Sequence, residues 1–229
     1  MPTLDWLKKE FHYGYDSGDV ERWFPGAVRR REEKAIGGSY RRVFRRAALP
    51  CFKPDSTVLE MGPGRGSWSR ALIRHLPKGR LITVDFQDVS PWLEPERHAG
   101  RLVCHQVRDN SFGEIADDSV DFFWAFGVIV HINQAHIAEI LRNLLPKMKP
   151  GGTAVFNYAD WEKLDAYGWR KGHVPEEFRN LPDDEIWWPR NDRKTMTTIA
   201  EEAGWNVVSA DLDLVKRDPI IRLRRGQDI

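Results

Sequence analysis

The residues with the clearest chemical potential lie between positions 60 and 85. An acid, Glu60, is followed by glycines at every second position: Gly62, Gly64 and Gly66. Glycine reaches backbone angles that other residues avoid, and it has no Cβ to keep a ligand away from the main chain. A second acid, Asp85, ends the next apolar run, at about the distance where a βαβ unit places its ribose-binding carboxylate. This pattern predicts a site for a nucleotide-like ligand.

Short apolar segments on either side of the glycines can position them. Val58 and Leu59 form a β-prone run before the turn, and the pattern after it is helical. We expect a strand over 57–61, a helix over 66–76 and a second strand over 80–85. Ligands bind beyond the carboxyl ends of parallel strands, where both acids then lie. The dinucleotide fingerprint G-x-G-x-x-G is not met, because residue 67 is Ser. An ordinary strand–turn–helix with incidental glycines is the alternative.

The acid, the glycine turn and the second acid resemble motif I and motif II of class I S-adenosylmethionine-dependent methyltransferases. In that family the glycine turn lies under the methionine part of the cofactor, and the second acid binds the ribose hydroxyls. A polar residue after the third strand contacts the adenine, and Asp109 and Asn110 both fit by position. The resemblance implies S-adenosyl-L-methionine as the cofactor. It implies the following cofactor-binding residues: Glu60, Gly62, Gly64, Gly66, Trp68, Asp85, Asp109 or Asn110, and Phe126.

The rest of the chain continues the alternation of strands and helices. We expect strands over 101–107, from Val120 onward and over 153–158, a helix from Gln134 to Met148, and a Lys-Pro-Gly-Gly turn that stops this helix. A helix over 194–203 and two strands over 205–212 and 218–224 close the chain. The expected fold class is α/β, the Rossmann-like class I methyltransferase fold. It has a seven-stranded, mostly parallel sheet with helices on both faces and an antiparallel last strand. The resemblance covers about residues 55–225.

Two segments outside this core are expected to form a cover. Residues 1–50 form an N-terminal aromatic arm and helix, read as a cap, and residues 51–229 form the methyltransferase domain. The arm folds over the ligand site or packs on the back of the domain. The long irregular insertion 161–192 is rich in aromatic residues and is expected to cover the substrate. The arginine-rich helix over 27–48 suggests phosphate binding, but a solvated face is the favoured interpretation.

Three ionisable residues follow the fourth and fifth strands and are the catalytic candidates. They are His131, Tyr158 and Asp160. His131 is the expected general base, because histidine titrates near neutral pH. A substrate-positioning or helix-capping histidine is the competing role, and Asp160 orients His131 or acts alone. No metal is expected: His131 and His136 are too far apart in sequence to share a helical face as H-E-x-x-H does.

Composition narrows the class of protein. The chain has 229 residues, 41% of them hydrophobic and 30% charged, with a net charge of +1. Such a balance is atypical of a dedicated nucleic-acid binder, so nucleic acid is not an expected partner. The two cysteines form no C-x-x-C pair, which suggests a reducing compartment. Without a signal peptide or a membrane-spanning run, we expect a cytoplasmic protein that has no membrane partner and could form a homo-oligomer.

The expected acceptor is a small molecule. The segment Phe126 to Ile132 and the aromatic arm look similar to bacterial O-methyltransferases that act on sugars or other polyhydroxylated molecules. Many of those carry His-His-Ser-Asn after the fifth strand, where this chain has Asn157-Tyr158-Ala159-Asp160. The alternatives are an RNA or protein methyltransferase that uses the arginine-rich helix, and a non-catalytic cofactor-binding module. The amino-methylating Asn-Pro-Pro-Tyr motif is absent after the fourth strand.

Overall fold

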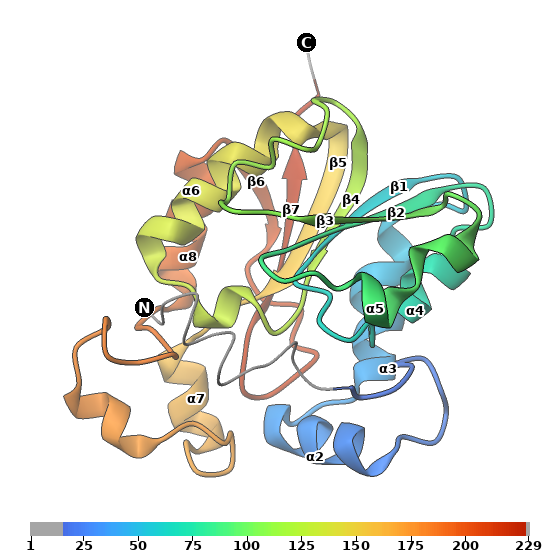
Figure 1. Ribbon diagram of the computed structural model, residues 1–229. Helices are drawn as coiled ribbons and strands as arrows, with labels where there is room; N and C mark the ends of the chain where they lie inside the picture. The colour runs from blue at the N-terminus through green and yellow to red at the C-terminus, as the bar shows by residue number, and fades with distance from the viewer. Residues whose placement is uncertain (1–15, 228–229) are drawn as a thin grey trace.

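The computed structural model describes residues 16–227 (Figure 1). Seven strands form one sheet: β1 (Thr57–Met61), β2 (Arg80–Asp85), β3 (Leu102–Gln106), β4 (Val120–Ala125), β5 (Met148–Asn157), β6 (Trp205–Ser209) and β7 (Ile220–Arg225). The α-helices are α2 (Ala27–Ile36), α3 (Tyr40–Val43), α4 (Ser69–Arg74), α5 (Ser90–Leu93), α6 (Gln134–Leu144), α7 (Trp161–Tyr167) and α8 (Arg193–Glu202). Shorter helical turns lie at Phe44–Ala48, Leu49–Cys51, Pro95–His98, Ile129–His131, Leu145–Lys147 and Glu176–Asn180.

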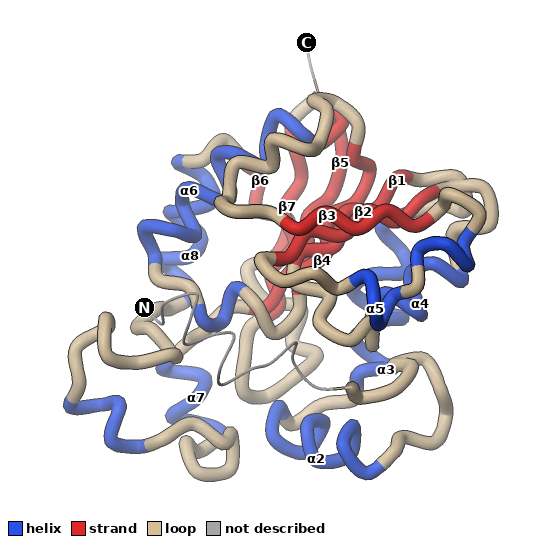
Figure 2. The backbone as a smooth tube through the Cα atoms, in the orientation of Figure 1, coloured by secondary structure: helices blue, strands red, loops and turns tan. Residues whose placement is uncertain are grey.

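The strand order confirms the expected fold class. The order is β3-β2-β1-β4-β5-β7-β6, and β1 pairs in parallel with both β2 and β4 (Figure 2). Only β7 runs antiparallel to its neighbours β5 and β6. Because β1 to β5 run in the same direction, their carboxyl ends meet at one edge of the sheet, and this edge is where ligands bind in such folds.

Helices cover both faces of the sheet because consecutive strand residues face opposite sides. Val58 and Phe122 pack on the face covered by α3 and α4, whereas Leu59 and Phe123 pack on the face covered by α6 and α8. A strand that is buried on both faces has a nearly continuous run of apolar residues, and the sequence from 120 to 125 has such a run. The two cores hold the carboxyl edge of the sheet in place.

The fifth strand begins earlier than expected. Helix α6 ends at Leu144, and β5 already starts at Met148, so Pro150 and Gly151 lie in the strand instead of in a separating turn. The pairing of β4 with β5 is irregular between Val120 and Phe122. An irregular ladder of this kind accommodates a proline and a glycine at positive φ, which regular pairing would disfavour.

Two segments far apart in sequence lie beyond the carboxyl edge of the sheet. Figure 1 shows α2 and the 161–192 segment side by side below the strands, and the Tyr167 hydroxyl donates a hydrogen bond to the Lys34 carbonyl. The insertion has its own apolar cluster, in which Trp169 and Trp188 are buried. The first fifteen residues of the expected aromatic arm lie outside the described part of the chain. Within the described part, Trp23 and Phe24 are exposed and do not fold over the site.

None of the helices within residues 16–227 is long and apolar enough to cross a bilayer.

Candidate functional site

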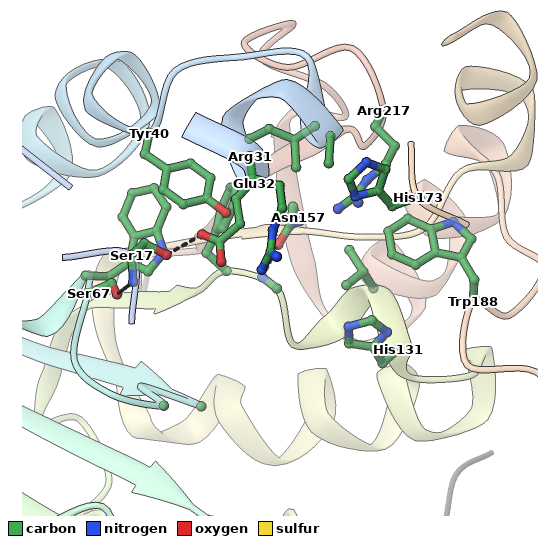
Figure 3. Close-up of a pocket in the computed structure, with 18 of the residues that line it drawn as sticks. Ser17, Arg31, Glu32, Tyr40, Ser67, His131, Asn157, His173, Trp188 and Arg217 are labelled. Carbon is green, nitrogen blue, oxygen red and sulfur yellow. Dashed lines mark hydrogen bonds between the residues drawn. The ribbon is translucent and has the colours of Figure 1, made fainter. Parts of the chain in front are cut away.

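A cavity of about 570 Å³ lies where the carboxyl ends of β1, β4 and β5 meet the two covering segments (Figure 3). Gly62 and Gly64 from the turn after β1 line one side. Phe126 lies just past β4, and Asn157 ends β5. Helix α2 and the 161–192 insertion complete the walls. The cavity therefore occupies the position that the sequence pattern predicts for a ligand.

The glycine turn requires glycines for two reasons. Gly62, Gly64 and Gly66 all have positive φ, at 67°, 53° and 79°. Residues with a Cβ adopt such angles at a cost of roughly 1–2 kcal/mol. A Cβ on Gly62 would also lie 2.3 Å from Cγ2 of Val128. The turn thus brings bare main chain to the cavity wall, as a ligand held by backbone groups requires.

The two acids flank this turn, and burial weakens both. Glu60 is buried and accepts a hydrogen bond of 2.6 Å from the Ser69 hydroxyl. Burial raises the pKa of Glu60 to about 8, and the nearby Asp85 carboxylate adds to the rise. Burial raises the pKa of Asp85 to about 6, partly offset by hydrogen bonds from the N–H groups of Gln87 and Gly64. Asp85 is thus held against the glycine turn, while Glu60 points to the start of α4.

Aromatic side chains form the wall next to the turn. Trp68 and Phe126 both line the cavity, with ring centroids 4.6 Å apart. Tyr40 contacts both rings, at 5.0 Å from Trp68 and 5.5 Å from Phe126. Such offset and edge-on pairs stabilise one another beyond their buried area. The wall is therefore rigid, and it faces the space above the glycine turn.

His131 lines the opposite end of the cavity. Its Nδ1 lies 2.8 Å from the Trp187 carbonyl oxygen, which can only accept, so Nδ1 carries the proton and donates. Burial lowers the pKa of His131 to about 4, and the bond to Trp187 offsets this only in part. The imidazole is therefore neutral at neutral pH, with its acceptor lone pair on Nε2. The rings of Trp187 and Trp188 pack edge-on against it, at 5.6 Å and 5.7 Å.

The other two catalytic candidates do not line this cavity. Tyr158 is buried in the core on the α6 and α8 face of the sheet, and its hydroxyl donates a 3.0 Å hydrogen bond to the Ala210 carbonyl. Asp160 caps α7 by accepting from the Lys163 N–H at 2.8 Å. Burial raises the pKa of both groups. The structure therefore brings His131, but neither Tyr158 nor Asp160, to the cavity.

The two adenine candidates lie after β3, outside the walls of the 570 Å³ cavity. Asp109 is exposed, and hydrogen bonding to the Ser111 hydroxyl and then to the Ser111 N–H lowers its pKa. Asn110 is half-buried, and its carbonyl accepts from the Asn143 side chain. The geometry does not choose between them. Among the described residues, no three His, Cys, Asp or Glu side chains gather as metal ligands would.

A buried polar network in the cavity wall was missed by the sequence analysis. Asn157 accepts a 2.7 Å hydrogen bond from the Gly127 N–H and donates to Asp218 at 3.1 Å. Arg217 forms two bonds to the same Asp218 carboxylate, at 2.7 Å and 2.9 Å. Its third bond, from Nη1, goes to the Gly172 carbonyl at 2.9 Å. The place of Asn157 at a strand end was the one signal that could have identified it.

Glu32 was also missed, since nothing in its sequence neighbourhood marks it. It comes from α2 and lines the middle of the cavity, where one carboxylate oxygen accepts from the Ser17 hydroxyl (Figure 3). The other oxygen, Oε1, is buried and makes no hydrogen bond of standard geometry within residues 16–227, although the Tyr40 hydroxyl interacts with the same carboxylate. Burial raises the pKa of Glu32, and the Ser17 and Tyr40 hydroxyls offset this rise in part.

Comparisons with known proteins address the family. A family model described as a methyltransferase domain matches residues 29–210. A comparison with curated proteins found no match.

Solved structures share the fold. One from Pyrococcus horikoshii is 12% identical with a TM-score of 0.62, covering 96% of this chain and 98% of that one. A SAM-dependent methyltransferase from Aquifex aeolicus is 16% identical with a TM-score of 0.55, covering 76% of this chain and 84% of that one. A Bordetella parapertussis protein described as a possible exported protein is 16% identical with a TM-score of 0.59; 80% of this chain covers 66% of that protein.

The glycine turn provides a first test. Replacing Gly62 with alanine adds both strain at positive φ and a clash with Val128, whereas Gly100→Ala adds the strain alone, since nothing lies within 4 Å there. We expect Gly62→Ala to lower the free energy of unfolding by about 1–3 kcal/mol more than Gly100→Ala does. We also expect it to abolish the thermal shift with S-adenosylhomocysteine. Equal thermal shifts for the two variants would show that the turn does not face the cofactor.

Burial of Glu60 provides a second test. Its folded pKa of about 8 lies above the usual unfolded value of about 4.3, so the fold is increasingly penalised as pH rises from near 4 through 8. Glu60→Gln removes that penalty. The variant should melt together with the wild type near pH 4 and above it near pH 9, measured by calorimetry. Exposed Glu96→Gln is the control, for which we expect no such divergence.

Proposed function

The chain belongs to the family of methyltransferase domains and is an S-adenosylmethionine-dependent methyltransferase, and on this premise we propose that it methylates a hydroxyl group of a small, polyhydroxylated molecule such as a sugar. The single observation that carries the proposal is the cavity itself. Its volume of about 570 Å³ suits one small acceptor beside the methionine end of the cofactor. Its far end is lined by Trp187, Trp188 and His131.

The residues at the near end fit the cofactor, which supplies an already activated methyl group when bound. The glycine turn presents main chain without side chains to the cavity at Gly62 and Gly64, which suits the methionine part. Asp85 lies outside the cavity walls but is bonded to the Gly64 N–H of the turn and to the Gln87 N–H, and in the proposed complex it accepts hydrogen bonds from the ribose hydroxyls. Trp68 and Phe126 exclude water from the space above the turn. The chain therefore contributes orientation and a dry environment.

The residues at the far end fit an acceptor with hydroxyl groups. The half-buried Trp187 ring offers an apolar surface beside polar groups, and the buried Trp188 ring supports it from behind. His131 is held with its lone pair on Nε2, because its Nδ1–H is bonded to the Trp187 carbonyl. In the proposed reaction His131 accepts the proton of the attacking hydroxyl, and the wall around it excludes water. Tyr158 and Asp160 do not line the cavity and have no part in the proposed step.

The domain organisation supports the same proposal. We propose that residues 1–50 and the insertion 161–192 act together as a cover over the methyltransferase domain of residues 51–229. Glu32 of α2 and Trp188 of the insertion both line the cavity. A cover made from two such segments sequesters a small acceptor from solvent.

An RNA acceptor is a second candidate, favoured by one surface. Arg41 stacks on the exposed Trp23 ring at 3.8 Å, and a hollow lined by Arg41, Arg42, Arg45 and Arg46 adjoins it. Arginines beside an exposed aromatic ring suit single-stranded nucleic acid. A filter-binding series with single-stranded RNA decides: salt-dependent binding that is lost in Trp23→Ala supports this candidate, and absence of binding removes it.

The proposed base makes a pH prediction. Because burial lowers the pKa of His131 to about 4, kcat at saturating cofactor should stay level from near pH 8 to near pH 5 and fall only toward pH 4. His131→Ala should reduce kcat by about 10²–10⁴-fold and leave the thermal shift with S-adenosylhomocysteine intact. His98→Ala, a histidine outside the cavity, is the control. Unchanged turnover in His131→Ala would rule out the base role.

The acceptor class is tested by labelled-methyl transfer. Purified protein with isotopically labelled cofactor and a panel of sugars, sugar derivatives, amines, RNA and protein should label polyhydroxylated small molecules, at oxygen. The position of the label is read by mass spectrometry and NMR of the product. Labelling confined to amines or to macromolecules would contradict the proposed acceptor.

A further inference from the structure

A second hollow, here called the mouth groove, opens beside the cavity. It has a volume of about 490 Å³ and lies between α2 and the loop that follows α7. His173 lines both the mouth groove and the cavity, so the two spaces adjoin at this residue. Figure 1 shows the loop after α7 beside α2 at the side of the sheet where the carboxyl ends lie. A ligand that passes the exposed His173 side chain would reach from the cavity into the mouth groove.

The mouth groove is positively charged. Its walls carry three cations, Lys34, Arg170 and Lys171, and one carboxylate, Glu176. The three cations are exposed and form no salt bridge to a carboxylate within residues 16–227. The ammonium of Lys171 lies over the Tyr167 ring at 4.3 Å, a contact that holds its charge at the rim without neutralising it. This local excess is notable in a chain with a net charge of only +1.

The groove is also firmly built. The Tyr167 hydroxyl bonds to the Lys34 carbonyl at 2.6 Å, which joins its two sides. Arg217 bonds to the Gly172 carbonyl at 2.9 Å and anchors the loop that carries Lys171 and His173. Trp169 is buried beneath the groove. Cations on a braced frame lose less conformational freedom when they bind an anion than cations on a loose loop do.

The interior of the cavity is closer to charge balance. Glu32 and Arg31 both line it, and the Ser17 and Tyr40 hydroxyls interact with the Glu32 carboxylate. The charge of Arg217 is already matched by Asp218, to which it forms two hydrogen bonds. A hydroxyl-rich part of a ligand thus suits the interior, and an anionic part suits the mouth groove. This asymmetry fixes the direction in which an acceptor enters.

We propose that the mouth groove binds an anionic group of the acceptor, a phosphate or a carboxylate, while the hydroxyl to be methylated lies in the cavity near His131. The proposal deepens the proposed function and rests on it. The acceptor class narrows from polyhydroxylated molecules in general to those with a negative charge at one end, such as sugar phosphates or sugar acids. Lys34, Arg170 and Lys171 are then specificity-determining residues.

The first experiment tests the groove without needing the acceptor. Full-length protein saturated with S-adenosylhomocysteine is titrated with inorganic phosphate, and in parallel with acetate, while NMR follows the indole N–H of Trp169. We expect a saturable shift whose Kd rises about tenfold in the Arg170→Ala, Lys171→Ala double variant, equivalent to about 1.4 kcal/mol. Lys78→Ala removes one exposed cation at the opposite edge of the sheet and should change nothing. The stronger of the two anions identifies the preferred group. Equal binding by the double variant and the wild type, or no saturation, overturns the proposal.

The second experiment tests the acceptor. A small-molecule extract is incubated with the enzyme and labelled cofactor, and the labelled products are separated on an anion exchanger at neutral pH. We expect the label in the retained fraction. For an acceptor identified from that fraction, we expect the KM to rise about tenfold in the double variant with kcat little changed, since the groove lies away from the reacting group. Label confined to unretained products overturns the proposal. Absence of any label contradicts the proposed function, and the phosphate titration still decides whether the groove binds anions.

Discussion

The site depends on the hydrogen bonds made by one side chain, Asn157. Asn157 lies at the end of β5. Its side chain accepts a hydrogen bond from the N–H of Gly127, which follows β4, and donates one to the carboxylate of Asp218, which precedes β7. Asp218 is fully buried and would be destabilising without partners, but the paired Arg217 guanidinium compensates its charge. Arg217 in turn bonds to Gly172 in the insertion and packs over the Trp188 ring at 4.6 Å. A continuous set of interactions thus connects the sheet to the cover of the cavity.

The cover itself is made of two unrelated parts of the chain. Helix α2 precedes the sheet, and the insertion follows β5, so neither is adjacent to the other in sequence. Their contact is nevertheless specific, because the Tyr167 hydroxyl bonds to the Lys34 carbonyl. The loop before β7 joins them, since the N–H groups of Lys216 and Arg217 bond to the Ile36 carbonyl and the Arg217 side chain bonds to the Gly172 carbonyl. The bonds from Lys216 and Arg217 satisfy the Ile36 carbonyl, the last one of α2, which no later turn of the helix can reach. The end of one helix therefore becomes the joint between the two parts.

Much of the fold and the cofactor half of the site could be predicted from the sequence, because the signals there are local. The acid, the glycines and the apolar runs lie within short windows, and strand β1 has the predicted bounds of 57–61. The acceptor half could not be predicted, because its residues meet only through tertiary contacts. Tyr158 illustrates the difficulty: consecutive residues at a strand end face opposite sides, so Asn157 enters the cavity and Tyr158 enters the core. Glu32 and Arg217 come from segments that no periodicity places near β5.

The shared joint at the end of α2 has a kinetic consequence. Hydrogen bonds join three segments in pairs. Lys34 of α2 bonds to Tyr167 at the end of α7, Ile36 of α2 bonds to the loop before β7, and Arg217 of that loop bonds to Gly172 in the loop after α7. None of the three can swing outward alone without breaking hydrogen bonds to the other two. The entrance is therefore expected to open as a unit. Binding of the cofactor and acceptor and release of both products then share this one opening. When the chemical step is fast, the frequency of opening limits turnover.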